Sequence, residues 1–249
     1  MDRTLPADRR RAARHPGVTW GLGDFFAVYL VGFVAAYILA SVGYGISGDE
    51  PGHAGALTEG LAILGQFGGW VVALVVVSRR KGRGSLRSDF GLVVHARDLW
   101  LVLAGIGLEI ALALMLFPIS RLVPNQHQGV VNDLESARGL HLALLALFAG
   151  LIAPVCEELL FRGLLLRALQ RRFSPLIAVA VSALVFALAH PALDPRWGTF
   201  AIVPAFFALG AVSGAAAVRR GDLSVSIMLH IGFNFLTTFG AVVDGIHHH

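Results

Sequence analysis

The chain has 249 residues, of which 56% are hydrophobic and only 14% are charged. About a quarter of the residues of a soluble domain are charged, so this composition excludes a soluble globular class. The net charge of +4 is compatible with nucleic-acid binding, but the arginines lie in short clusters between apolar stretches. Such clusters are typical of membrane topology signals, and we expect no nucleic-acid partner.

Long apolar stretches predict the transmembrane helices of an all-α protein. A helix needs about 20 apolar residues to cross the hydrocarbon core of a bilayer. The sequence predicts a single membrane domain over residues 1–249, a polytopic helical bundle of about seven spans, or eight if residues 119–139 hold a re-entrant segment. The seven stretches are 24–46, 55–77, 99–118, 140–160, 174–190, 199–218 and 223–243.

Basic residues crowd the N-terminus and every second connector after it. Because cytoplasmic loops collect Lys and Arg, this alternation predicts a cytoplasmic N-terminus. The Ala-, Val-, Gly- and Arg-rich composition further suggests a multi-pass protein of a bacterial inner membrane, surrounded by lipid. We interpret the terminal His247–His249 as a tag remnant and assign it no chemistry. The clusters are Arg3, Arg9, Arg10, Arg11 and Arg14; Arg79, Arg80, Lys81, Arg83, Arg87 and Arg97; Arg167, Arg171 and Arg172; and Arg219 and Arg220.

The fourth apolar stretch contains three charged residues, Glu157, Glu158 and Arg162. A charged side chain near the bilayer centre costs roughly 2.5–3.5 kcal/mol on insertion scales, so such residues usually mark function. Glu158 precedes Arg162 by four positions, the favourable order for a helical ion pair, which suits a structural role equally well. Glu157 points about 100° away from Glu158, given 3.6 residues per turn, and is the better candidate for a general base.

Three more polar residues interrupt later stretches: His190, His230 and Asn234. His230 and Asn234, four residues apart, share one helix face. If the chain turns near residues 173–175, Glu157 and His190 each lie about 16 residues from the turn, or roughly 24 Å at 1.5 Å per residue. His230 and Asn234 lie about 14 and 20 Å beyond a turn at Gly221. The similar depths predict one shared site.

A carboxylate with two histidines and an asparagine suits the activation of water. We expect Glu157 to act as the base, assisted by His190, and His230 and Asn234 to donate hydrogen bonds to an oxyanion. The alternative is a catalytic zinc ion held by Glu157, His190 and His230. The lack of a His-Glu-x-x-His motif and the origin of the three ligands on separate helices favour a site without a cofactor.

Three motifs in order resemble those of the CPBP family, the CAAX prenyl endopeptidases and bacteriocin-processing proteins. The resemblance covers about residues 140–243, the predicted catalytic core, and implies an intramembrane endopeptidase with a peptide or protein substrate reached in or from the membrane. It implies a base at Glu157, a site completed by His190, His230 and Asn234, and supporting roles for Glu158 and Arg162. The motifs are Glu-Glu-x-x-x-Arg at Glu157, Glu158 and Arg162, Phe-x-x-x-His at Phe186 and His190, and His-x-x-x-Asn at His230 and Asn234.

Two other classes of function compete with the peptidase. A proton-coupled transporter could use intramembrane Glu and His as a relay, but it predicts inverted repeats, and the sequence contains none that we recognise. A non-catalytic membrane scaffold or immunity protein is the other alternative, and the motifs alone do not distinguish it from an enzyme.

Overall fold

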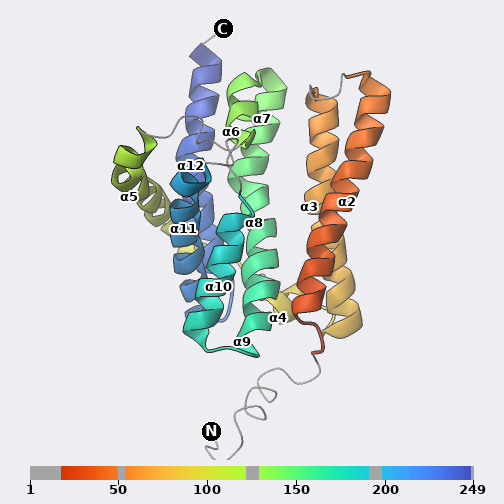
Figure 1. The fold of residues 1–249 in the computed structure, drawn as a ribbon, viewed down its shortest axis with the longest axis vertical. Helices are drawn as coiled ribbons and strands as arrows, with labels where there is room; N and C mark the ends of the chain where they lie inside the picture. The colour runs from red at the N-terminus through yellow and green to blue at the C-terminus, as the bar shows by residue number, and fades with distance from the viewer. Residues whose placement is uncertain (1–17, 50–53, 122–128, 191–197, 248–249) are drawn as a thin grey trace, which may run out of the picture. The chain divides into compact units, whose positions relative to one another are not determined.

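The computed structural model describes residues 18–49, 54–121, 129–190 and 198–247, and within these ranges all regular structure is helical. The all-α prediction is therefore confirmed (Figure 1). The elements are α2 (Leu22–Ser47), α3 (Ala56–Lys81), α4 (Leu86–Phe90), η1 (Ala96–Asp98), α5 (Leu101–Ser120), α6 (Gly129–Ser136), α7 (Gly139–Leu147), η2 (Phe148–Ile152), α8 (Ala153–Glu158), η3 (Leu159–Leu166), α9 (Arg167–Gln170), α10 (Pro175–Leu188), α11 (Gly198–Arg220) and α12 (Ser224–His247).

Within the described residues, six helices are long and apolar enough to cross a membrane, which agrees approximately with the predicted count. The fifth predicted stretch, 174–190, forms only the 14-residue helix α10. At 1.5 Å per residue this helix is about 21 Å long, too short to cross a core of about 30 Å. The six candidate spans are Leu22–Ser47, Ala56–Lys81, Ala96–Pro118, Gly139–Gln170, Ile202–Arg220 and Ser224–Asp244.

The chain divides into two compact units, one of residues 1–92 and 163–178, the other of residues 93–162 and 179–249. Most of the predicted catalytic core, 140–243, lies in the second unit. The organisation of residues 1–249 as a single domain stays a prediction.

In the first unit, α2 and α3 pack side by side through small residues (Figure 1). A Cβ atom at Gly65 would meet the backbone of Ala35, and one at Gly43 would meet Thr58. Such close approach is how helices associate in lipid, where packing replaces the hydrophobic effect. At the α2–α3 connection, hydrogen bonds from the Thr58 hydroxyl and the Gly55 N–H hold the pKa of Asp49 below its ordinary value.

In the second unit, α5 packs against α12 at two glycines. A Cβ atom at Gly232 would lie 3.0 Å from the Gly105 Cα and closer still to the Val102 carbonyl oxygen. On the same pair of helices, Glu109 accepts hydrogen bonds from the Thr237 hydroxyl (3.1 Å) and the Leu236 N–H (3.3 Å). Glu109 therefore joins α5 to α12, a role that the sequence analysis did not predict.

The turn between α11 and α12 lies where the sequence predicts it. Gly221 adopts φ +77°, a left-handed conformation that glycine enters without steric cost. Its N–H donates to the Ala217 carbonyl (2.9 Å) and so closes the last turn of α11. The tight turn fixes how far His230 and Asn234 lie along α12 from the start of the hairpin.

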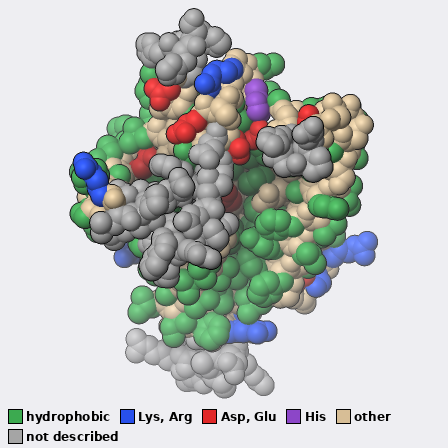
Figure 2. All heavy atoms as spheres, turned by 45° about the horizontal axis from the view of Figure 1, so that its top comes forward, with side chains coloured by type: hydrophobic (Ala, Val, Ile, Leu, Met, Phe, Trp, Pro, Cys, Tyr) green, Lys and Arg blue, Asp and Glu red, His purple; other side chains and the backbone are tan. Residues whose placement is uncertain are grey.

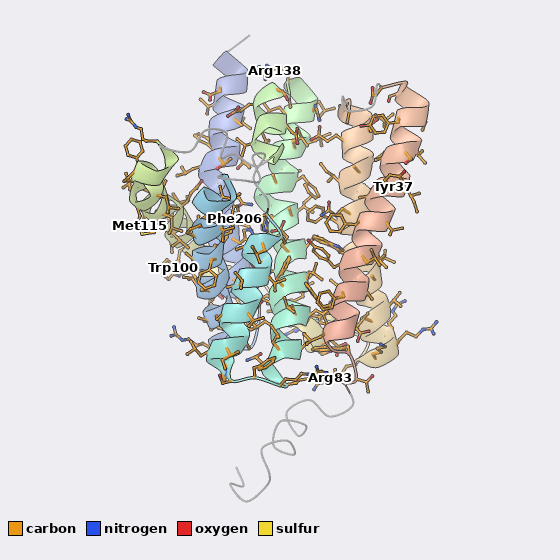
Figure 3. The ribbon with its side chains drawn as sticks, viewed as in Figure 1. Tyr37, Arg83, Trp100, Met115, Arg138 and Phe206 are labelled. Atoms are coloured by element: carbon orange, nitrogen blue, oxygen red, sulfur yellow. The ribbon has the colours of Figure 1, made fainter. Side chains whose placement is uncertain are left out.

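The outward faces of the helices are apolar. On α5, Leu103 is 70% exposed and Leu114 72%, and Met115, labelled in Figure 3, is 63% exposed. On the face shown in Figure 2, hydrophobic side chains cover much of the area that is not grey, with few Lys or Arg side chains among them. Exposed apolar area on this scale is suited to lipid and not to water, and the chain is a multi-pass membrane protein.

The contact between α5 and α12 makes a prediction about stability. We expect Gly232→Ala to destabilise the protein by about 1–3 kcal/mol, because the added methyl group forces two backbones apart. Gly240→Ala, on the same helix, is the matched control, since its Cβ would meet nothing within 4 Å. It should be neutral or stabilising by up to about 1 kcal/mol. Unfolding in mixed micelles at increasing SDS measures both, and equal midpoints would contradict the packing account.

Candidate active site

The two adjacent glutamates lie between two irregular segments of one long helix. Residues 139–170 form a continuous helical run in which η2 and η3 have π-helical geometry and α8 between them ends at Glu158. π-helical turns within α-helices occur frequently at functional sites, because they change the direction of side chains and free backbone groups. Glu157 and Glu158 thus lie where the helical register changes.

Three helical segments bring Glu157, His190 and His230 together. The Glu157 Oε2 lies 3.5 Å from the His190 Nε2 and 3.6 Å from the His230 Nε2. Glu157 comes from α8, His190 follows the end of α10, and His230 belongs to α12. These three residues, for which the sequence predicts a shared site, therefore lie within ion-pair distance of one carboxylate oxygen.

The polar cluster has a buried base and an exposed edge. The side chains of Glu158 and Arg162 are 0% exposed and that of His230 is 1% exposed, whereas Glu157 and His190 are 14% and 16% exposed. Glu157 and His190 are therefore the more accessible side chains of the cluster, whereas Glu158 and Arg162 are closed off from solvent. This difference separates the two glutamates, as their directions on the helix suggested.

At the buried base, the Glu158 carboxylate contacts an arginine and a histidine. Its Oε1 lies 3.0 Å from the Arg162 Nη1 and 3.0 Å from the His230 Nδ1. The Arg162 guanidinium also lies over the Phe186 ring, 4.1 Å from its centroid. No nitrogen of Arg162 makes a well-angled protein hydrogen bond within the described part of the chain, so ion pairing and the ring face hold this cation.

The hydrogen bonds at the Nδ1 atoms fix how the two imidazoles face Glu157. The His190 Nδ1 lies 2.7 Å from the Phe186 carbonyl oxygen, and because a carbonyl only accepts, this Nδ1 carries a proton. The His230 Nδ1 likewise donates to the Glu158 carboxylate. Both Nε2 atoms therefore face the Glu157 Oε2. A proton that moves during the reaction can be exchanged between this carboxylate oxygen and the two Nε2 atoms.

Asn234 takes a different partner from the one that a shared site would suggest. Its Nδ2 donates to the Ala149 carbonyl in η2, at 3.0 Å. Among the contacts of the described residues, no hydrogen bond joins Asn234 to Glu157 or to either histidine. Asn234 remains on the face of α12 that carries His230, one turn further along the helix.

Comparison with known proteins matches this part of the chain to a family. Residues 139–236 match the family model described as type II CAAX prenyl endopeptidase Rce1-like, and this region contains all three motifs. The matched region belongs to the CPBP family.

Two curated relatives share part of this CPBP region. The membrane-embedded CAAX protease MroQ of Staphylococcus aureus (strain USA300) is 34% identical over 90 residues, which cover 34% of each chain. An uncharacterized 24.3 kDa protein of Escherichia coli is 28% identical over 92 residues, 36% of this chain and 40% of that protein. The match thus spans between a third and two fifths of the relatives' length. No solved structure matches the chain.

One residue of the site lies outside the three CPBP motifs. Phe206, labelled in Figure 3, comes from α11 and stacks on His190 with centroids 4.5 Å apart and rings 9° from parallel. Phe186 contacts the same imidazole at 4.4 Å. The sequence does not predict a role for Phe206, because a phenylalanine that contacts the site cannot be distinguished by sequence from one that faces lipid or packs between helices.

A zinc ion would need at least three side chains of the site arranged around one point. Within residues 18–49, 54–121, 129–190 and 198–247, no group of three or more His, Cys, Asp or Glu side chains is arranged to hold a metal ion, and this includes the set of Glu157, His190 and His230. The two Nε2 atoms and the carboxylate oxygen are nevertheless chemically the donors that zinc prefers.

Proposed function

We propose that this protein is an intramembrane endopeptidase that hydrolyses a peptide bond with a water molecule activated by Glu157. The observation that carries the proposal is the position of one carboxylate oxygen, the Glu157 Oε2, between two imidazole nitrogens at the exposed edge of a buried charged cluster. A carboxylate so placed can take a proton from water and pass it on. The family match and the relative named a CAAX protease support the same reaction class.

In the first step, Glu157 takes a proton from water while the water oxygen bonds to the carbonyl carbon of the substrate. The protonated Glu157 can then donate a hydrogen bond to the His190 Nε2, whose lone pair is free because the proton of this ring is on Nδ1. His190 therefore assists the base. When the tetrahedral intermediate collapses, the C–N bond breaks and the proton moves from Glu157 to the leaving amine nitrogen.

His230 and Asn234 are proposed to stabilise the oxyanion. The Glu158 carboxylate faces the His230 Nδ1 at 3.0 Å and the Glu157 carboxylate faces its Nε2 at 3.6 Å, so His230 is placed to present an N–H beside the base. The His230 Nε2–H and one Asn234 N–H are then the oxyanion donors.

The substrate and location follow from the surroundings of the site. We propose a peptide or protein substrate that reaches Glu157 in or from the bilayer, in the inner membrane of a bacterium, with the N-terminus and the basic connectors in the cytoplasm. Both curated relatives are bacterial proteins. The CAAX specificity in the name of one relative belongs to that protein, and the substrate here is to be identified experimentally.

Digestion of a peptide library tests the function. We expect the purified protein in nanodiscs to cleave a subset of peptides at defined bonds identified by mass spectrometry, and the cleavage to persist after treatment with a chelator. Loss of cleavage on chelation, restored by zinc, would replace the metal-free mechanism with the zinc-dependent one held by Glu157, His190 and His230. If no peptide or membrane-reconstituted substrate is cut, the non-catalytic scaffold becomes the better explanation.

The contact between Phe206 and His190 predicts a graded series of variants. Phe206→Leu should lower kcat/KM by up to about tenfold, because an aromatic pair contributes about 0.5–1.5 kcal/mol beyond burial and here orients the imidazole. Phe206→Tyr keeps the ring and should retain activity. Phe207→Leu, at a neighbouring side chain that is 37% exposed, is the control and should change activity less than twofold. Equal losses for Phe206→Leu and Phe206→Tyr would contradict the positioning role.

A further inference from the structure

The hydrogen bond between Asn234 and Ala149 depends on a carbonyl that the helix itself leaves free. In a regular α-helix, the Ala149 carbonyl would accept the N–H of Ala153, four residues later. In η2 that N–H donates instead to the Phe148 carbonyl, five residues back. In this register, the donor for Ala149 would come from residue 154, and residue 154 is a proline without an N–H.

A free backbone carbonyl in a membrane span needs a partner, because lipid supplies none. The Asn234 Nδ2 provides it at 3.0 Å from α12. Since a carbonyl only accepts, the contact also determines which end of the Asn234 amide faces η2. One N–H of the amide is then occupied, and the other N–H projects from the same nitrogen at a fixed angle.

We propose that Pro154 is a positioning residue that reserves the Ala149 carbonyl for Asn234 and thereby aims the second Asn234 N–H at the reacting carbonyl oxygen. This inference rests on the oxyanion role given to Asn234 under the proposed function. It assigns a reason for the proline three residues before Glu157, and for the π-helical turn that accompanies it. Pro154 itself is buried and touches no reacting atom in this scheme.

Pro154→Ala is the variant that tests the link. The new N–H competes with Asn234 for the Ala149 carbonyl, and the amide is freed to rotate. We expect kcat to fall about 10- to 100-fold with little change in KM, since small misplacements of catalytic groups cost this much. The unfolding midpoint should not fall, because alanine restores a helix N–H. Pro118→Ala, at the proline within α5, is the control and should leave kcat unchanged.

The side-chain amide signal of Asn234 tests the effect of Pro154 on Asn234 without relying on activity. The chain contains three asparagines, Asn125, Asn132 and Asn234, so selective ¹⁵N-asparagine labelling gives three side-chain amide pairs, and Asn234→Asp assigns one of them. In the wild type, one Asn234 amide proton should be protected from exchange with solvent, and Pro154→Ala should remove that protection.

The two readouts separate the failure of this inference from the failure of the proposed function. Loss of protection together with reduced kcat supports the positioning role. An unchanged Asn234 amide signal in Pro154→Ala, or a changed signal with unchanged kcat, overturns it. If the wild type cleaves no substrate, the proposed function fails, and the amide signal alone still decides whether Pro154 controls the orientation of Asn234.

Discussion

Glu157→Gln is expected to abolish peptide cleavage, with a loss of about 10²–10⁴ in kcat, the range that a positioned general base contributes. Glutamine keeps the size of the side chain and can still approach both imidazoles, but its amide cannot take a proton from water. Because the Glu157 side chain is 14% exposed and the ion pair of Arg162 is made with Glu158, Glu157→Gln leaves the buried pair in place. The loss should therefore appear in turnover and not in stability.

The control for Glu157→Gln is Glu109→Gln. Glu109 is also a carboxylate within a candidate span, but its partners are Thr237 and Leu236 on α12 and not the charged cluster. Its substitution should leave kcat within a few-fold of the wild type. Cleavage by Glu157→Gln at more than a tenth of the wild-type rate would contradict the assignment of the base, as would an equal loss for Glu109→Gln.

Arg162→Met is expected to produce the largest loss of stability, about 3–5 kcal/mol, because it leaves the buried Glu158 carboxylate without its nearest full positive charge. Both side chains are 0% exposed, so water cannot replace the lost partner. Methionine fills much of the volume beneath Phe186, which limits the contribution of a cavity. Unfolding in mixed micelles at increasing SDS measures the change.

Two further variants separate burial from charge pairing. The double variant Glu158→Gln with Arg162→Met removes both charges and should recover most of the stability lost in Arg162→Met alone. Lys81→Met removes the partner of Asp24 in a pair whose lysine is 49% exposed, and it should cost at most about 1 kcal/mol. Equal losses for Arg162→Met and Lys81→Met would show that the pair at the base of the site is not structurally important.

Composition and the spacing of apolar stretches predict the fold class, because lipid permits few alternatives to helices. The helical rise similarly predicts that Glu157 and His190 meet, since both are measured from one turn, and the structure places their facing atoms 3.5 Å apart. The i,i+4 spacing of Glu158 and Arg162 likewise indicates their ion pair, which is present at 3.0 Å. These features depend on regular helical geometry, either along one helix or outward from one turn, which a sequence encodes directly.

Features that depend on departures from regular geometry could not be predicted in this way. The π-helical segments beside Glu157 shift the register, so the partner of Asn234 is a carbonyl that helix counting treats as satisfied. The short length of α10 is hidden because the residues that follow it continue the apolar pattern up to His190. Phe206 acts through a contact between two helices, for which its sequence neighbourhood contains no signal.

The most direct test of the shared site is a double-mutant cycle on Glu157 and His190 under single-turnover conditions, with the protein in excess over a cleaved peptide. If the two residues handle the same proton, Glu157→Gln, His190→Gln and the double variant should fall to nearly the same residual rate, because groups that act as a unit are not additive. Losses that multiply in the double variant would contradict a site in which the Glu157 carboxylate and the His190 imidazole work together.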